Sequence, residues 1–434
     1  MQQSNLKEFL KYTTLNITGM IGLSCYILAD TFFVSKGLGM TGLAALNLAI
    51  PVFSFIHGCG LMLGMGGATW YSIFRGQKAQ DQCDRIFTNM LCLTLAIAGL
   101  FILASFFLSD ELTRILGADA ETADMTHTYL KVLLLFSPAF MVNDMMACFV
   151  RNDSNPRLPM LSMLFGSLSN IVLDYIFIFP LHLGILGAVL ATGAAPLIGI
   201  TILSTHFLKK QNGFHIKKER PRIKVILSGI SLGFSSLVTE VSSGIVIIVF
   251  NVIILGIAGN AGVAAYGVIA NLSLVVIAIY TGLAQGMQPL VSRSYGEGNK
   301  TCIRQYLNYG FVSVLVLSAG IYASLFWFAE PIVKIFNSDG NVLLQEIAVS
   351  GMKLYFTAIP FAGINIMLSL FFTATNRVFP AQSISITRGF ALIIPAAFFL
   401  ARLAGMTGIW MAFPITECMV FLLAVIFLIR CLKI

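Results

Sequence analysis

The chain has 434 residues, of which 57% are hydrophobic and only 11% are charged, and its formal net charge is +8. A water-soluble domain of this size cannot bury so large a share of apolar residues, so the composition excludes an ordinary soluble fold and indicates a protein that lies in lipid. The positive charge does not indicate nucleic-acid binding, because the basic residues are spread over many short polar segments and form no single patch.

Twelve apolar stretches follow one another along the chain, each long enough to cross about 30 Å of hydrocarbon. Because backbone groups in lipid must be hydrogen-bonded within their own segment, and strand-like alternation is absent, we predict an all-α integral membrane protein. The spans are 9–35, 43–74, 86–108, 125–150, 158–181, 184–208, 225–257, 262–292, 304–329, 343–374, 380–402 and 407–430. The polar start of the chain lacks a cleavage site of small residues, so we expect no removed signal peptide.

Charge predicts the orientation of these spans. Lys and Arg gather in alternate connections, above all in the basic segment 209–224, whereas Asp110, Glu111 and Asp119 lie in a connection on the other side. The positive-inside rule therefore puts both termini and segment 209–224 on the cytoplasmic side. We expect a multi-pass protein of a prokaryotic plasma (inner) membrane, with the basic segment near anionic lipid headgroups.

The two halves of the chain repeat one another. Segment Gly39–Ala45 (GMTGLAA) matches Gly259–Ala265 (GNAGVAA) at a shift of 220 positions, and Gly184 and Gly187 match Gly405 and Gly408 at a shift of 221. Parallel repeats of this length are typical of transporters. We predict a six-helix bundle over 1–208, a linker over 209–224 and a second six-helix bundle over 225–434. A pseudo-twofold axis along the membrane normal would relate the bundles around a central cavity.

Polar residues inside the spans of the first half are the candidates for function. Asp30 follows Tyr26 by one helical turn, so Tyr26 can hydrogen-bond it, and Asn170 and Asp174 share a helix face in the same way. Counting about 1.5 Å per residue puts Asp30, Asp174 and Thr192 at a similar depth, so we expect them to meet. Their oxygens suit Na⁺, and the same two acids can instead share a proton.

The second half serves as a comparison. The equivalent positions of Asp30, Asn170, Asp174 and Thr192 are Phe250, Ala391, Pro395 and Phe413. Residues needed only for folding should recur in both copies, so this asymmetry favours a functional site.

Other charges within spans have weaker assignments. Glu240 and Asp144 are candidates for the wall of a substrate cavity, with local hydrogen bonding as the alternative for Glu240. Glu417 is a weaker candidate for the cavity wall than Asp144. Lys353 and Arg388 are expected to extend toward the membrane surface.

The sequence contains no Walker loop and no metal-binding arrangement of Cys or His, and its eight cysteines are not expected to form disulfides. We therefore expect neither an enzyme nor a protein with a bound cofactor. Transport would draw on an ion gradient or on the gradient of the solute itself.

Four segments resemble the multidrug and toxic compound extrusion (MATE) family, and the resemblance extends over the whole chain. They are Ala29–Val34 (ADTFFV), the Gly-rich helix that ends at Arg75-Gly76, Asn170–Asp174, and Gly282–Leu290 (GLAQGMQPL) with Tyr295-Gly296. The resemblance implies export of organic, often cationic, drugs or toxins in exchange for H⁺ or Na⁺. It puts Asp30, Asn170, Asp174 and Thr192 at a cation site, with Tyr26 beside it, in a protein expected to be monomeric.

The sequence departs from the family at two places. The first span has Gly19 and Gly22 where some relatives have a proline, and Asn365 stands near the position where one branch has an aspartate that works with the acid at Glu240. A second, carboxy-terminal cation site is therefore not expected to be complete. Two other functions stay open: a flippase for lipid-linked oligosaccharides or polysaccharides, and a non-transporting membrane scaffold or receptor.

Overall fold

The computed structural model describes residues 2–337 and 340–432, and within those ranges the chain is helical, with no strand. The helices of the first half are α1 (Gln2–Gly76), α2 (Gln80–Phe107), α3 (Ser109–Ile115), α4 (Ala123–Leu135), α5 (Ser137–Asn152), α6 (Arg157–Ile178) and α7 (Gly184–Leu208). Those of the second half are α8 (Ile223–Gly296), α9 (Lys300–Trp327), α10 (Ala329–Phe336), α11 (Val342–Tyr355), η1 (Phe356–Ala358), α12 (Ile359–Ala374), α13 (Val378–Ile386), η2 (Thr387–Ala391) and α14 (Ile393–Leu432).

Three of these helices each contain two membrane spans joined at a sharp kink. The kinks lie at Gly39 (φ 69°, ψ −158°), Gly259 (φ 59°, ψ −155°) and Gly405 (φ 55°, ψ −131°). This backbone conformation is accessible to glycine and strongly disfavoured for residues that carry a Cβ. With α1, α8 and α14 divided there, with α4 and α5 forming one span bent by 48°, with α11 and α12 forming another, and with α13 continuing into the first part of α14, the twelve predicted spans are confirmed.

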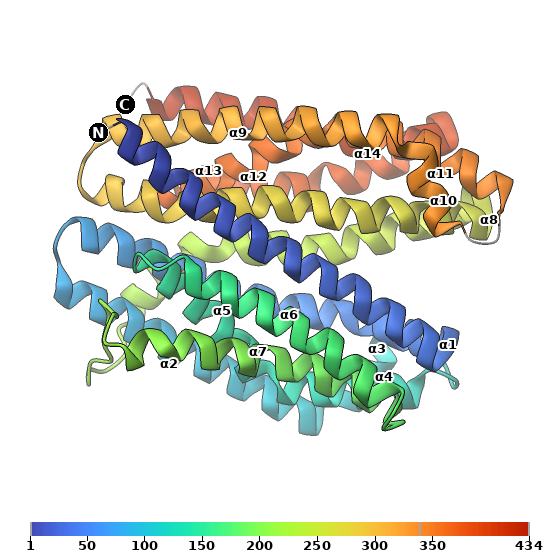
Figure 1. Ribbon diagram of the computed structural model, residues 1–434, viewed down its shortest axis with the longest axis horizontal. Coiled ribbons are helices and arrows are strands. Elements are labelled where there is room, and N and C mark those ends of the chain that lie inside the picture. The colour runs from blue at the N-terminus through green and yellow to red at the C-terminus, as the bar shows by residue number, and fades with distance from the viewer. Residues whose placement is uncertain (1, 338–339, 433–434) are drawn as a thin grey trace.

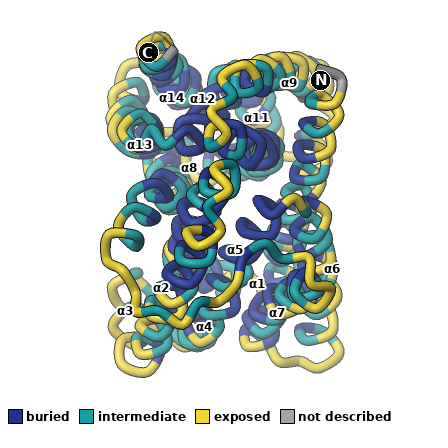
Figure 2. Tube along the Cα trace, turned by 90° about the vertical axis from the view of Figure 1, so that its left-hand side faces the viewer, coloured by how far each residue is buried: buried dark blue, intermediate teal, exposed yellow. Residues whose placement is uncertain are grey.

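Two bundles lie one above the other in Figure 1, each built from one half of the sequence. One hydrophobic core runs from Val34 to Phe214, and the other gathers residues from Phe250 to Leu428. Figure 2 shows that buried positions follow the inside of each bundle, whereas the connections at the ends are exposed. The predicted all-α architecture of two six-helix bundles is therefore confirmed.

Helix α1 belongs to both bundles. Its beginning contributes Phe9 and Tyr12 to the core of the second half. It then crosses the molecule diagonally, so that its middle lies in the first bundle (Figure 1). A shift of this helix would therefore be felt by both halves.

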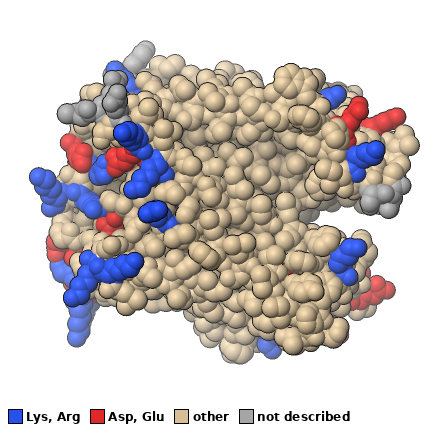
Figure 3. Space-filling model, viewed as in Figure 1, with Lys and Arg blue, Asp and Glu red and all other residues tan. Residues whose placement is uncertain are grey.

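The two ends of the molecule differ in charge and in packing. Lys and Arg gather at one end, which we call the basic end, and both termini lie there (Figures 1 and 3). At the opposite end Figure 3 shows a hollow between the two bundles.

At the basic end the bundles touch backbone to backbone. A Cβ added to Gly66 of α1 would lie 2.0 Å from the carbonyl oxygen of Gly229 in α8, and one on Gly233 would lie 1.9 Å from that of Met62. Side chains of any size are excluded from such contacts, which small residues make possible in membrane helices.

Hydrogen bonds between the halves add to this contact. The Gln288 side-chain amide donates to the Thr69 hydroxyl (2.9 Å) and accepts from Asn152 (3.1 Å). The buried Arg151 guanidinium donates to Gln285 of the second half (2.5 Å) and, within the first half, to Asn16 (2.9 Å). The basic end is thus closed by both packing and polar contacts.

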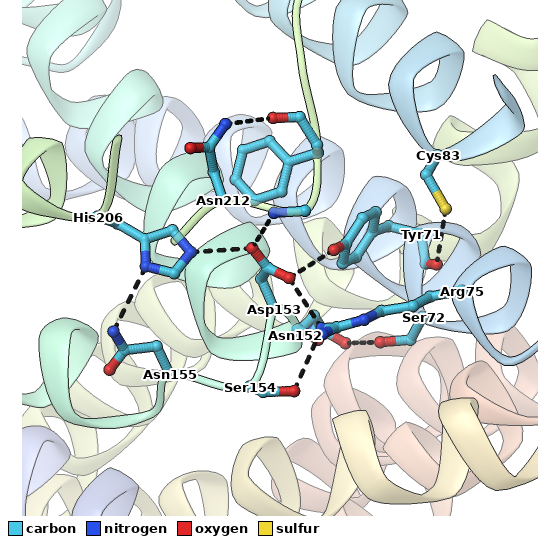
Figure 4. Close-up of polar contacts among 12 residues, drawn as sticks. Tyr71, Ser72, Arg75, Cys83, Asn152, Asp153, Ser154, Asn155, His206 and Asn212 are labelled. Atoms are coloured by element: carbon cyan, nitrogen blue, oxygen red, sulfur yellow. Dashed lines mark hydrogen bonds and ion pairs between the residues drawn. The ribbon is translucent and has the colours of Figure 1, made fainter. Parts of the chain in front are cut away.

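The first part of the linker is fixed to the first bundle (Figure 4). The buried Asp153 carboxylate accepts hydrogen bonds from the Tyr71 hydroxyl (2.6 Å), Arg75 (2.8 Å) and the backbone N–H of Gly213 (2.6 Å), and His206 Nε2 lies 2.8 Å from it. The next residue, Phe214, is fully buried. The linker therefore does not hang free between the bundles.

Candidate functional site

Glycines bring the predicted site residues of the first bundle together. A Cβ on Gly19 or Gly22 of α1 would collide with Met163 or Leu164 of α6, at 2.8 and 2.6 Å, so these glycines allow α6 to approach α1 closely. On the other side of α6, Gly187 of α7 packs in the same way against Phe177. Helices α1, α6 and α7 therefore meet at short distance, and each supplies part of one polar cluster.

The cluster is centred on two acids. The carboxyl groups of Asp30 on α1 and Asp174 on α6 lie against each other. With its amide oriented to suit its neighbours, Asn170 donates to Asp174 Oδ2 (3.0 Å) and accepts from the backbone N–H of Thr192 (3.2 Å). Asp30 is 7% exposed and Asp174 is fully buried. We call Asp30, Asp174, Asn170 and Thr192 the acid-pair site.

The buried acids keep oxygen atoms without a partner. Asp30 Oδ1 and Asp174 Oδ1 receive no hydrogen bond from the described residues. Two adjacent carboxylates in an apolar interior cannot both stay charged without a counter-ion. The arrangement can therefore hold a proton or a small cation. In the described chain no group of three His, Cys, Asp or Glu side chains is placed to hold a metal ion, so the oxygens for such a cation would include those of Asn170 and Thr192.

Two tyrosines border the acid-pair site. Tyr26 lies within electrostatic reach of Asp30 and Asp174, and also of Asp144. Tyr129 of α4 is buried beside Thr192 and within reach of Asp30. Tyr129 is not predicted as a site residue from the sequence, because nothing in its spacing along the chain connects it to either acid.

A small cavity of about 50 Å³ lies between the two bundles. Glu240 lines it, whereas Asp144 does not. Asp144 Oδ2 instead lies 2.7 Å from His57 Nδ1. The lining residues are Leu61, Met65, Ser235, Ser236, Thr239, Glu240, Thr281, Gln285, Ile366, Ser369, Leu370, Ser385 and Arg388.

The second bundle contains a polar cluster that the sequence analysis missed. Arg388 does not extend to the membrane surface as expected: its Nη2 donates to Glu417 Oε1 (2.7 Å), and the Glu417 side chain is only 2% exposed. Asn365 donates to the other Glu417 oxygen (2.7 Å). Arg388 reaches the cavity from η2, a π-helical turn, and such turns are common at functional sites. The loss of the acid pair in this half therefore does not mean that the half lacks buried charges.

Two six-helix bundles that share a cavity, with a pair of buried acids in one of them, define a multi-pass membrane transporter of the internally repeated kind. The MatE family model matches residues 17–176 and 226–399. The chain belongs to this family, the MATE transporters, which confirms the resemblance found in the sequence.

Relatives and solved structures agree with this assignment. The multidrug export protein MepA of Staphylococcus saprophyticus is 24% identical over 433 residues, covering 99% of this chain and 95% of that protein. MepA of Staphylococcus aureus (strain MSSA476) is 26% identical over 428 residues, covering 98% and 94%. The outward-facing structure of a multidrug resistance MATE family transporter of the MOP superfamily superposes with a TM-score of 0.92 at 22% identity, covering 99% of this chain and 97% of that chain.

Proposed function

We propose that this protein is a secondary active antiporter that exports organic, often cationic, compounds in exchange for H⁺ or Na⁺ by alternating access. The acid pair of Asp30 and Asp174 is the observation that carries the proposal, because its partnerless buried oxygens suit a small cation. Family membership and the multidrug export relatives support the class of substrate. The basic end would face the cytoplasm of a prokaryote, in accord with the positive-inside rule.

Helix α1 can couple the ion to the substrate. Binding of a cation would neutralise the acid pair and so change the position that α1 prefers. Because the beginning of α1 packs in the core of the second bundle, the same shift would act on the contacts that close the basic end. Exchange then requires only that ion and substrate favour different conformations.

The cavity supports export of cations better than movement of a pyrophosphate-linked lipid. A flippase for such lipids would need a strongly cationic cavity, yet Arg388 is the one cation among the described lining residues and is paired with Glu417. Glu240 adds an acidic side chain to the same wall.

Transport of a fluorescent organic cation in proteoliposomes, under separately imposed pH and sodium gradients, tests the proposal. Asp30→Asn and Asp174→Asn should each reduce gradient-driven transport by about tenfold or more, which corresponds to about 1.4 kcal/mol of lost coupling. Asp110→Asn is the matched control, because that carboxylate is 84% exposed. Undiminished gradient-driven transport by the double variant Asp30→Asn/Asp174→Asn would refute the scheme.

A further inference from the structure

A second group of ionisable side chains lies apart from the acid-pair site. His57 of α1 faces Asp144 of α5 at 2.7 Å. Glu240 of α8 is the other acid within electrostatic reach of the imidazole. Among the described residues these two carboxylates are the titratable groups that act on His57, one from each neighbouring helix. We call His57, Asp144 and Glu240 the histidine cluster.

We propose that His57 is an exchangeable cation beside the cavity: its imidazolium offsets one of the two carboxylate charges of the histidine cluster until a cationic substrate binds at Glu240 and displaces the proton. This inference rests on the proposed function, since it assigns the place where an organic cation binds. It adds a second proton, separate from any carried by Asp30 and Asp174.

The neighbours of His57 fix the orientation of its imidazole and leave part of the ring exposed. Nδ1 lies 2.7 Å from Asp144 Oδ2, without the alignment of a hydrogen bond, and the ring stacks on Phe53 with centroids 5.9 Å apart and an interplanar angle of 6°. Phe140 in turn contacts Phe53 edge to face. The His57 side chain is 20% exposed and that of Asp144 11%. The ring is therefore fixed in orientation but not sealed off.

Glu240 connects the histidine cluster to the cavity. It lines the cavity wall, and its Cβ would lie 3.3 Å from a Cβ on Gly58, the residue next to His57. Gly58 and Gly60 leave room for Glu240 and Asp144 to approach α1 from two sides, since a Cβ on Gly60 would lie 3.0 Å from Asp144 Oδ2. A cation that reaches Glu240 therefore comes close to the charge on His57.

The charges balance when one proton is exchanged for one monocation. Two carboxylates and one imidazolium give the cluster a net charge of −1. Two carboxylates, a neutral imidazole and one bound monocation give the same value. A protonated His57 beside a bound cation would repel it strongly in surroundings of low dielectric, so the His57 N–H bond breaks, its electron pair stays on nitrogen, and the proton leaves to water.

A dye that cannot carry a proton reveals the exchange. We would titrate purified protein, in weak buffer with a pH indicator, with a quaternary ammonium dye and with an uncharged analogue of the same ring system. To separate the two sites, the background is Asp30→Asn/Asp174→Asn. We expect about one proton to be released per dye bound, none with the uncharged analogue, and an affinity for the dye that rises with pH by up to about tenfold per unit.

His57→Gln in the same background should still bind the dye through Glu240, but release no proton and lose the pH dependence of the affinity. His215→Gln is the matched control, because that side chain is 63% exposed on the linker. If His57→Gln unfolds, Asp144→Asn provides the test: it removes the acid that stabilises the imidazolium, so proton release should move to lower pH.

Three results would overturn the inference: no proton release in the Asp30→Asn/Asp174→Asn background, unchanged release in His57→Gln, or an unchanged pH profile in Asp144→Asn. Failure of the antiport proposal would show separately, as a wild-type protein that performs no gradient-driven transport in proteoliposomes.

Discussion

Gly66 and Gly229 touch through their backbones: a Cβ on Gly66 would lie 2.0 Å from the Gly229 carbonyl oxygen. The contact joins α1 of the first bundle to α8 of the second at the basic end. Neither helix can move relative to the other without breaking it. In the proposed alternating-access cycle, this pair would therefore lie on the surface where the two bundles separate.

Gly66→Val should prevent the basic end from closing. The added side chain cannot fit against the α8 backbone, and overpacking of this kind costs about 1–3 kcal/mol. The penalty falls only on the closed arrangement. Spin labels at Gln77 and Glu297, both exposed near that end, should report a longer distance. Gly99→Val is the control, because nothing lies within 4 Å of its Cβ position; equal distances in the two variants would contradict the prediction.

The Arg388–Glu417 ion pair should matter for the stability of the second bundle. Removing one partner leaves the other charged and buried, which costs about 3–5 kcal/mol. Arg388→Met and Glu417→Gln should each lower the Tm in detergent, and the double variant should recover much of the loss. The Arg114–Glu111 pair, whose side chains are 80% and 61% exposed, should show no measurable coupling energy when its two single variants and its double variant are compared in the same way. Additive losses at Arg388 and Glu417 would argue against the ion pair.

Asp153→Asn should release the linker. The carboxylate holds Tyr71, Arg75, His206 and the Gly213 backbone at once, and an amide cannot accept from all of them. Breaking such a buried network costs about 3–5 kcal/mol. Limited trypsin digestion should then cut faster at Lys217 and Lys218. Asp124→Asn, at an exposed position, should not change the rate, and an equally slow cut in Asp153→Asn would show that the linker does not depend on this carboxylate.

The rest of the linker should detach in acid. Hydrogen bonds from Lys217 lower the pKa of Asp81 from its ordinary 3.8 and that of Glu219 from 4.5. Because both carboxyls have lower pKa values folded than unfolded, their contribution is complete above the ordinary values and is lost as pH falls through the lowered ones. Hydrogen exchange of residues 215–222 should therefore be constant from pH 7 to about 5 and, corrected for intrinsic rates, accelerate below about pH 4. Added salt should weaken the same protection, since the pairs are exposed.

Tyr129→Phe should weaken the acid-pair site without unfolding the bundle. The phenol is buried beside Thr192 and near Asp30, so its loss removes about 0.5–1.5 kcal/mol of polar interaction. The ion concentration that gives half-maximal transport should rise several-fold. Tyr175→Phe is the control, because Tyr175 is 54% exposed. A change of equal size in both variants would mean that the Tyr129 hydroxyl does not contribute specifically to ion binding at the acid-pair site.

The sequence by itself predicted the spans, the repeat and the residues of the acid-pair site. Length and hydropathy suffice for spans, because lipid forces each one to satisfy its own backbone hydrogen bonds. Two of the glycine pairs that recur at a shift of 220 or 221 positions, Gly39 with Gly259 and Gly184 with Gly405, have positive φ, a conformation that residues with a Cβ do not readily adopt. Asp30, Asn170 and Asp174 could be selected because an acid in an apolar span is costly wherever it points.

Only the tertiary structure decided which polar groups meet across helices. Arg388 and Glu417 are 29 positions apart, and Tyr129 and Asp30 lie on separate helices, so no periodicity along the chain relates them. The same holds for His57 with Asp144, and for Asp153 with the linker. One-dimensional spacing determines which face of a helix a residue occupies. Which neighbour faces it depends on helix packing, and here that packing follows from where glycines let backbones touch.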